Sequence, residues 1–269
     1  ANSSLYVGHL FTVEHWTFIH YHTKFGGKHM KISPTLTEVK EIAKTGKYDI
    51  LPVSCEILSD FITPIEAMRI LQNVSTHCYL LESAQANEAW GRYTFLGYDP
   101  KLEINCIDGH MKLGKLSVET ENPSEYIRQI LSEYKSPKFD YLPSFTGGLV
   151  GYFSYDYLGY KEKSIRGKAR DTEDFKDVDL MLFDKVIAFD NLCQKIILIA
   201  NMSLDAPETG YNKAIVELKQ LRELLMHGEK KQNMGGKLLG EVTPLFEKEQ
   251  YCDCLLYTSP SPRDVEESR

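Results

Sequence analysis

The chain has 269 residues, 42% of them apolar, and carries a formal net charge of −7. That length and apolar content suffice for one large domain or two small ones, each with a real core. The negative charge, with no run of lysine or arginine among aromatic residues, excludes nucleic acid and anionic membranes as expected partners. No stretch approaches about eighteen consecutive apolar residues, so the sequence predicts no membrane span.

The six cysteines are scattered, and only Cys252 and Cys254 lie close together. This spacing fits neither a disulfide framework nor a zinc ribbon. Free cysteines without a bridging pattern are typical of a reducing compartment. A cytoplasmic location is therefore the expectation.

Residues 1–29 differ in composition from the rest of the chain. They contain five of the eight histidines, but not at the spacing that a metal site needs. Met30 then begins a segment with clear helix signals. Residues 1–29 are therefore predicted to be a non-native upstream extension, with the natural start at Met30.

Two helices are predicted early in the chain by their capping boxes. Thr35 with Glu38 begins the first, which is expected to end near Gly46. Thr63 with Glu66 begins the second, with proline at its first helical position.

Two further helices are predicted later in the chain. Residues 122–125 (NPSE) begin one, and the apolar residues that follow recur at a helical period. The other is expected from Pro207 to His227 and to end at Gly228. Arg222 interrupts the apolar face of that last helix.

Between the helices, short runs rich in aromatic and aliphatic residues indicate strands. They read HCYLLES, RYTFLGY and KLEINCI, and Asp108-Gly109 joins the last of them to HMKLG as a predicted hairpin. Residues 180–190 and 195–202 are predicted to form a second hairpin, of strands that are covered on both faces. Strands and helices do not alternate strictly. The predicted fold class is therefore α+β, with mixed or antiparallel, β-sandwich-like sheets flanked by helices.

The segment GGLVGYFSYDYLGY (147–160) combines glycines with tyrosines. Its glycines lack the lysine and the helix of a phosphate-binding loop, so they are expected to let a neighbouring backbone approach. Its four tyrosines are expected to belong to a core rather than to a stacking platform. They are Tyr152, Tyr155, Tyr157 and Tyr160.

The C-terminal part divides into three predicted segments. Residues 228–241 are polar and glycine-rich, as in a linker. Residues 242–253 could begin another helix. Residues 254–269 include Ser-Pro-Ser-Pro and lack an amphipathic period, so they are expected not to continue that helix and to be an artefactual tail.

The candidate site is the end of the strand that contains YLLES. Glu82 could hold the ammonium group of an amino acid by a charge-assisted hydrogen bond, and Ser83 adds a hydroxyl. Arg92 could bind the carboxylate of the same ligand in bidentate fashion. The alternative is an ordinary strand end whose polar groups are solvated.

Four stretches, in chain order, resemble one known family. YLLES, GRYTFLG, GGLVGYFSYD and DLMLFDKVIAFD resemble the N-terminal half of anthranilate synthase component I, over about residues 30–253. The resemblance implies that residues 30–227 form the N-terminal domain of that family. It also implies that residues 242–253 begin a truncated chorismate-binding domain.

The resemblance further implies a reaction, partners and an inhibitor. Component I converts chorismate and ammonia to anthranilate and pyruvate with Mg²⁺, and a glutamine amidotransferase subunit (component II) supplies the ammonia. Tryptophan inhibits by binding near the Leu-Leu-Glu-Ser segment. The tryptophan-binding residues here would then be Leu81, Glu82 and Ser83, to which Arg92 is our own addition.

The family's chorismate and Mg²⁺ residues belong to a C-terminal half whose motifs do not occur in this sequence. No catalytic or metal-binding residue is therefore predicted, and the chain alone is expected to be inactive. Two alternatives stay open at this point. They are a fragment of aminodeoxychorismate synthase component I and a stand-alone amino-acid-binding module.

Overall fold

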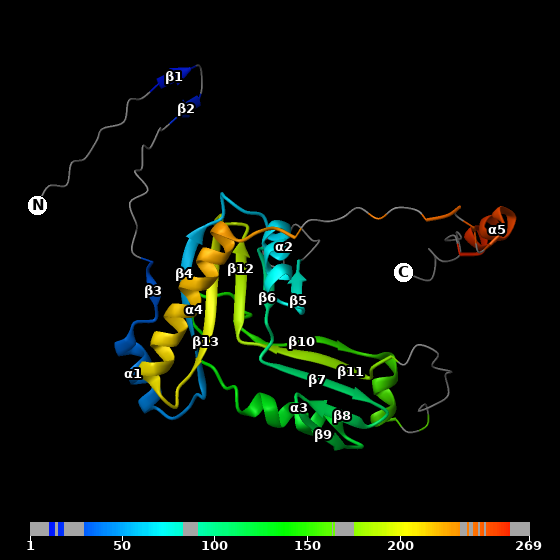
Figure 1. The fold of residues 1–269 in the computed structure, drawn as a ribbon, viewed down its shortest axis with the longest axis horizontal. Helices are drawn as coiled ribbons and strands as arrows, with labels where there is room; N and C mark the ends of the chain where they lie inside the picture. The colour runs from blue at the N-terminus through cyan, green and yellow to red at the C-terminus, as the bar shows by residue number, and fades with distance from the viewer. Residues whose placement is uncertain are drawn as a thin grey trace, which may run out of the picture. The chain divides into compact units, whose positions relative to one another are not determined.

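The structure is a computed structural model, which describes most of the chain (Figure 1). The described residues are 11–13, 16–18, 30–82, 91–162, 164, 175–231, 236, 239–241, 243–244 and 246–258. The chain divides into two compact units, Ala1–Lys231 and Gln232–Arg269. In the first unit, β1 (Phe11–Val13) and β2 (Trp16–Phe18) form a two-stranded antiparallel pair. The five N-terminal histidines lie outside the described residues.

The larger sheet of the first unit has six strands, in the order β3-β4-β13-β12-β6-β5. All of its pairings are antiparallel. The strands are β3 (Ile32–Ser33), β4 (Ile50–Leu58), β13 (Lys195–Ser203), β12 (Lys185–Asp190), β6 (Tyr93–Tyr98) and β5 (Cys78–Leu81).

Three helices cover one face of this sheet: α1 (Leu36–Lys44), α2 (Pro64–Val74) and α4 (Pro207–His227) (Figure 1). Both predicted capping boxes are present at the starts of α1 and α2. Gly228 is the C-cap residue of α4, as expected. Buried leucines of α4 pack with alternate residues of β13, such as Ile196 and Leu198, in one apolar core.

The opposite face of the six-stranded sheet is covered by a loop. Val186 and Ala188 of β12 and Ile197 and Ile199 of β13 pack there against Leu142. Aromatic side chains surround this small cluster, with Phe95 of β6 edge-on to Phe145 of the loop at 5.6 Å between ring centroids. Because β12 and β13 are buried on both faces, the prediction for their hairpin is confirmed.

The smaller sheet has five antiparallel strands, in the order β10-β11-β7-β8-β9. They are β10 (Gly148–Phe153), β11 (Val178–Phe183), β7 (Leu102–Ile107), β8 (His110–Leu113) and β9 (Leu116–Glu119). Asp108 and Gly109 both have positive φ and form the predicted β7–β8 turn. Helix α3 (Pro123–Ser132) packs Ile127 onto this sheet. The two antiparallel sheets with flanking helices confirm the α+β fold class.

Residues 180–190 differ from the prediction, because they form two strands in different sheets rather than one. The chain leaves β11 at Phe183, passes Asp184 and enters β12 at Lys185. Asn201 of β13 fixes the break, since its backbone N–H and its side-chain amide both donate to the Asp184 carbonyl, at 2.8 and 3.0 Å. The apolar run alone could not reveal this, because apolar residues lie on both sides of the break at Asp184.

The glycine-tyrosine segment is partly as predicted. Gly151 has φ +154°, and a Cβ there would lie 2.0 Å from the carbonyl oxygen of Asp179, so close backbone approach is confirmed. Tyr157 and Tyr160, in the 3₁₀-helix η1 (Tyr155–Tyr160), pack against the core of the smaller sheet. For the other two tyrosines the prediction is wrong. Tyr155 is 85% exposed and Tyr152 is 38% exposed, because they point away from that core.

The second unit contains one described helix, α5 (Lys248–Thr258). The prediction that residues after 253 do not continue this helix is wrong for 254–258. These residues contain no glycine or proline, and the next residue to disfavour helix is Ser259, which precedes Pro260. Among the described residues, no helix is both long and apolar enough to span a membrane.

Candidate functional site

The candidate site lies where β5 ends and β6 begins. β5 is an edge strand, and its last residue, Leu81, pairs with Phe95 of β6. Leu81 is 47% exposed, and Glu82, which follows it, is exposed as well. Ser83 lies outside the described residues. The strand end therefore exposes an apolar residue, Leu81, and a carboxylate, Glu82, at consecutive positions.

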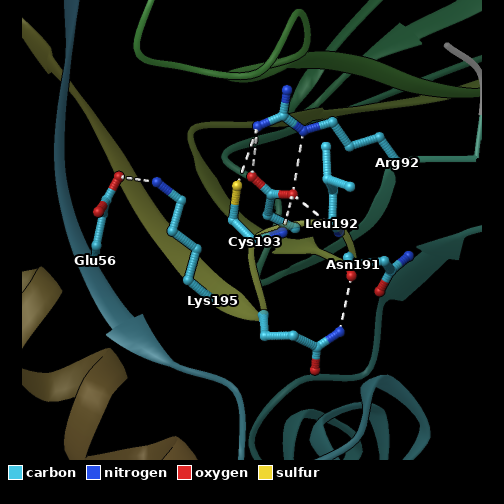
Figure 2. A network of polar contacts seen from close by, with 8 residues as sticks. Glu56, Arg92, Asn191, Leu192, Cys193 and Lys195 are labelled. Carbon is cyan, nitrogen blue, oxygen red and sulfur yellow. Dashed lines mark hydrogen bonds and ion pairs between the residues drawn. The ribbon is translucent and has the colours of Figure 1, made fainter. Parts of the chain in front are cut away.

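Arg92 lies directly before β6, at the same end of the sheet. Its Nε donates to Oδ1 of Asp190 at 3.1 Å and its Nη2 donates to Oδ2 at 2.8 Å (Figure 2). This is the two-point geometry that a guanidinium forms with a carboxylate. Asp190 ends β12, 98 residues further along the chain.

The side chain of Asp190 has no exposed surface, so its charge needs compensation. Besides Arg92, the backbone N–H groups of Leu192 and Cys193 donate to Oδ1, at 3.2 and 3.1 Å. Burial acts to raise the pKa of Asp190, but the hydrogen bonds from Arg92 and Cys193 outweigh it and hold that pKa below its usual value. Asp190 is therefore ionised at neutral pH.

Arg92 is held by more than this ion pair. The hydrogen bond to Asp190 raises the already high pKa of the guanidinium. Nη2 also donates to Sγ of Cys193 at 3.7 Å, and Cζ lies 4.9 Å from the centroid of the Tyr93 ring. The backbone is fixed as well, since the N–H of Asn191 donates to the Arg92 carbonyl at 2.9 Å. The side chain nevertheless keeps 36% of its surface exposed.

A second ion pair lies on the same face of the sheet. Lys195 of β13 pairs with Glu56 of β4 at 2.6 Å (Figure 2). In the sheet register, Lys195 lies opposite both Asp190 and Leu58, so all three side chains share one face. Glu56, two residues from Leu58, lies on that face too. Acidic and basic groups thus alternate from Glu56 of β4 through Lys195 and Asp190 to Arg92, the residue before β6.

The structure therefore brings Leu81, Glu82 and Arg92 to one end of the sheet. Sequence reasoning missed Asp190, Lys195 and Glu56. Asp190 had a usable signal, because it is an acidic residue at the end of an apolar run, like Glu82 directly after β5. Among the described residues, no group of three histidine, cysteine, aspartate or glutamate side chains is placed to hold a metal ion.

The sequence of this chain also matches a known protein family. A sequence profile for chorismate binding enzymes matches residues 76–256, which include β5, Arg92 and Asp190. The chain belongs to the chorismate-binding enzyme family.

The relatives of the chain are more specific. Anthranilate synthase component 1 of Acetivibrio thermocellus is 31% identical over an alignment 249 residues long, which covers 86% of this chain and 48% of the relative. The protein of the same name from Pseudomonas aeruginosa is 36% identical over an alignment 186 residues long, which covers 66% of this chain and 37% of the relative. The chain thus spans about half the length of these relatives, or less.

One solved structure is also similar. The crystal structure of anthranilate synthase component I from Streptococcus pneumoniae aligns with 62% of this chain and 36% of its own, at 25% identity and a TM-score of 0.41.

Proposed function

We propose that this chain is the N-terminal, tryptophan-sensing part of an anthranilate synthase component I. That enzyme converts chorismate and ammonia to anthranilate and pyruvate, and a glutamine amidotransferase subunit supplies the ammonia. The observation that carries the proposal is the alignment over 86% of the chain with a relative of that name. The family match supports the same substrate, chorismate.

Four residues of this chain contribute to the proposed tryptophan site. Leu81 offers an apolar surface to the indole ring, and Glu82 offers a carboxylate to the ammonium group. Ser83 contributes a hydroxyl, and Arg92 receives the ligand's carboxylate. The convergence of Leu81, Glu82 and Arg92 at one end of the sheet supports this assignment.

Catalysis is assigned to residues beyond those of this chain. The enzyme requires Mg²⁺, which would polarise the oxygen atoms of its substrate. The described residues do not fit that ion, because they bring no three acidic, histidine or cysteine side chains together. We therefore derive no catalytic step from this chain and expect the chain alone to form no anthranilate.

Ligand binding tests the sensing role directly. Titration calorimetry of the 269-residue chain should detect binding of L-tryptophan, and the full-length enzyme should be inhibited in about the micromolar range that is typical of metabolites. Ser83→Phe should weaken binding, because a bulky ring replaces the hydroxyl. Ser117→Phe, the same substitution at an exposed serine of β9 in the smaller sheet, is the control. A chain that does not bind tryptophan would refute the sensing role.

A fusion tests the catalytic assignment. The chain alone, given chorismate, ammonium and Mg²⁺, should produce no anthranilate fluorescence. Joined to the C-terminal half of the Acetivibrio thermocellus relative, it should produce anthranilate, and tryptophan should inhibit that production. An active fusion that is indifferent to tryptophan would contradict the proposal.

A further inference from the structure

We propose that Asp190 is a positioning residue for the tryptophan site, and that it acts through Arg92. Asp190 fixes one edge of the guanidinium, so that the other edge is directed at the carboxylate of the ligand. The inference rests on the function proposed above. It adds Asp190, which lies outside the segment from Leu81 to Arg92 that contains the proposed tryptophan site.

The donor groups of Arg92 divide into two sets. A guanidinium has five N–H donors. Nε and one N–H of Nη2 go to Asp190, and Nη2 also contacts Sγ of Cys193. Among the described residues, no side chain or carbonyl accepts from Nη1. Since 36% of the side chain is exposed, Nη1 is the part of Arg92 that is left for a ligand.

Asp190 is suited to this role because it cannot move easily. Its side chain is fully buried, and the backbone N–H groups of Leu192 and Cys193 hold it in place. The turn that supplies them also bonds to the backbone of Arg92 through Asn191. An arginine fixed in advance loses less conformational entropy when it binds a carboxylate. The expected effect of Asp190 is therefore on affinity for the carboxylate, not for the rest of the ligand.

The Glu56–Lys195 pair provides a matched control. It lies on the same face, two strands further from β6, and its carboxylate is 52% exposed. Neither side chain of the pair contacts Arg92, although the charge of Asp190 also acts on Lys195, which lies opposite it. Glu56→Gln therefore removes one charge from the same face of the sheet and leaves the guanidinium in place.

The experiment compares two ligands that differ only in a carboxylate. L-Tryptophan and tryptamine share the indole ring and the ammonium group, and calorimetry on the full chain gives a Kd for each. The ratio of the tryptamine Kd to the tryptophan Kd measures recognition of the carboxylate, which should be about tenfold or more in the unaltered chain. A merely structural loss would weaken both ligands and leave the ratio unchanged.

Five variants test the positioning role. Arg92→Gln should bring the ratio close to one, and Asp190→Asn should lower it several-fold. Glu56→Gln should leave it within about twofold. Asp190→Asn added to Arg92→Gln should change the ratio no further, because both act on the same contact. The double variant also leaves no unpaired buried charge. If either single variant fails to fold, Asp190→Glu is measured in its place, and it should lower the ratio less than Asp190→Asn.

The outcomes separate the two proposals. Tryptophan binding by the unaltered chain, with a ratio that Asp190→Asn leaves unchanged, overturns the positioning role alone. Equal effects of Asp190→Asn and Glu56→Gln on the ratio overturn it too. No tryptophan binding by the unaltered chain overturns the proposed function, and the positioning role with it.

Discussion

Asp190 and Glu56 are carboxylates on the two strands that flank β13, and each pairs with a basic side chain on one face of the sheet. Asp190 has no exposed side-chain surface, whereas 52% of the Glu56 side chain is exposed. Asp190 accepts from two N–H groups of Arg92 and from two backbone N–H groups, while Glu56 accepts from Lys195. Burial and geometry, rather than charge, therefore distinguish an ion pair that holds a side chain in place from an ordinary surface ion pair.

Loss of the buried pair should have the largest effect on stability. Arg92→Ala leaves the Asp190 carboxylate buried with only backbone donors, and should lower the free energy of unfolding by about 2–3 kcal/mol. Fully buried pairs cost about 3–5 kcal/mol when one partner is removed, and the partial exposure of Arg92 reduces that figure. Urea denaturation measures the change, with Arg92→Lys as the variant that keeps the charge. A loss below about 0.5 kcal/mol would show that the pair resembles a surface pair.

The effect of acid should follow Asp190. Its folded pKa is lowered, so the stability it contributes is present above its unfolded pKa of about 4 and is lost as the pH falls through the folded pKa. The difference in unfolding free energy between the unaltered chain and Arg92→Gln should therefore shrink from pH 7 to pH 3. Urea denaturation at several pH values tests this. A difference in unfolding free energy that stays constant with pH would mean that Arg92 does not stabilise the ionised Asp190 carboxylate.

The exposed pair should give the smallest effect. Glu56→Gln should lower the free energy of unfolding by about 0.2–1 kcal/mol, because water screens the charge. Added salt at 1 M should abolish most of this difference, since the Debye length falls to about 3 Å. A larger, salt-independent loss would place Glu56 in the same class as Asp190 and remove the contrast between the pairs.

Local rules predicted the parts of the fold that depend on neighbours in sequence. The capping boxes at Thr35 and Thr63 predicted where α1 and α2 begin, because each box is closed within four residues. Asp108-Gly109 predicted the β7–β8 turn because both residues accept positive φ. The resemblance to one family, carried by four short stretches, led to the same family as the profile match.

Other features depend on partners far along the chain. No local pattern predicted β4, whose Pro52 argues against a central strand. The strand forms because β13 pairs along its whole length, while β3 pairs only with Ser54 and Cys55 and leaves the rest of β4 as an edge that tolerates proline.

The residues of the candidate site also divide into those that the sequence predicted and those that only the tertiary structure brings together. The sequence by itself determined that Leu81, Glu82 and Arg92 flank one strand connection, since strand ends can be read from short apolar runs. Only the tertiary structure decided that Asp190, 98 residues from Arg92, is the group that holds it. The physical reason is that antiparallel pairing sets β12 beside β6, and a pairing between distant strands leaves no mark in the local pattern of either.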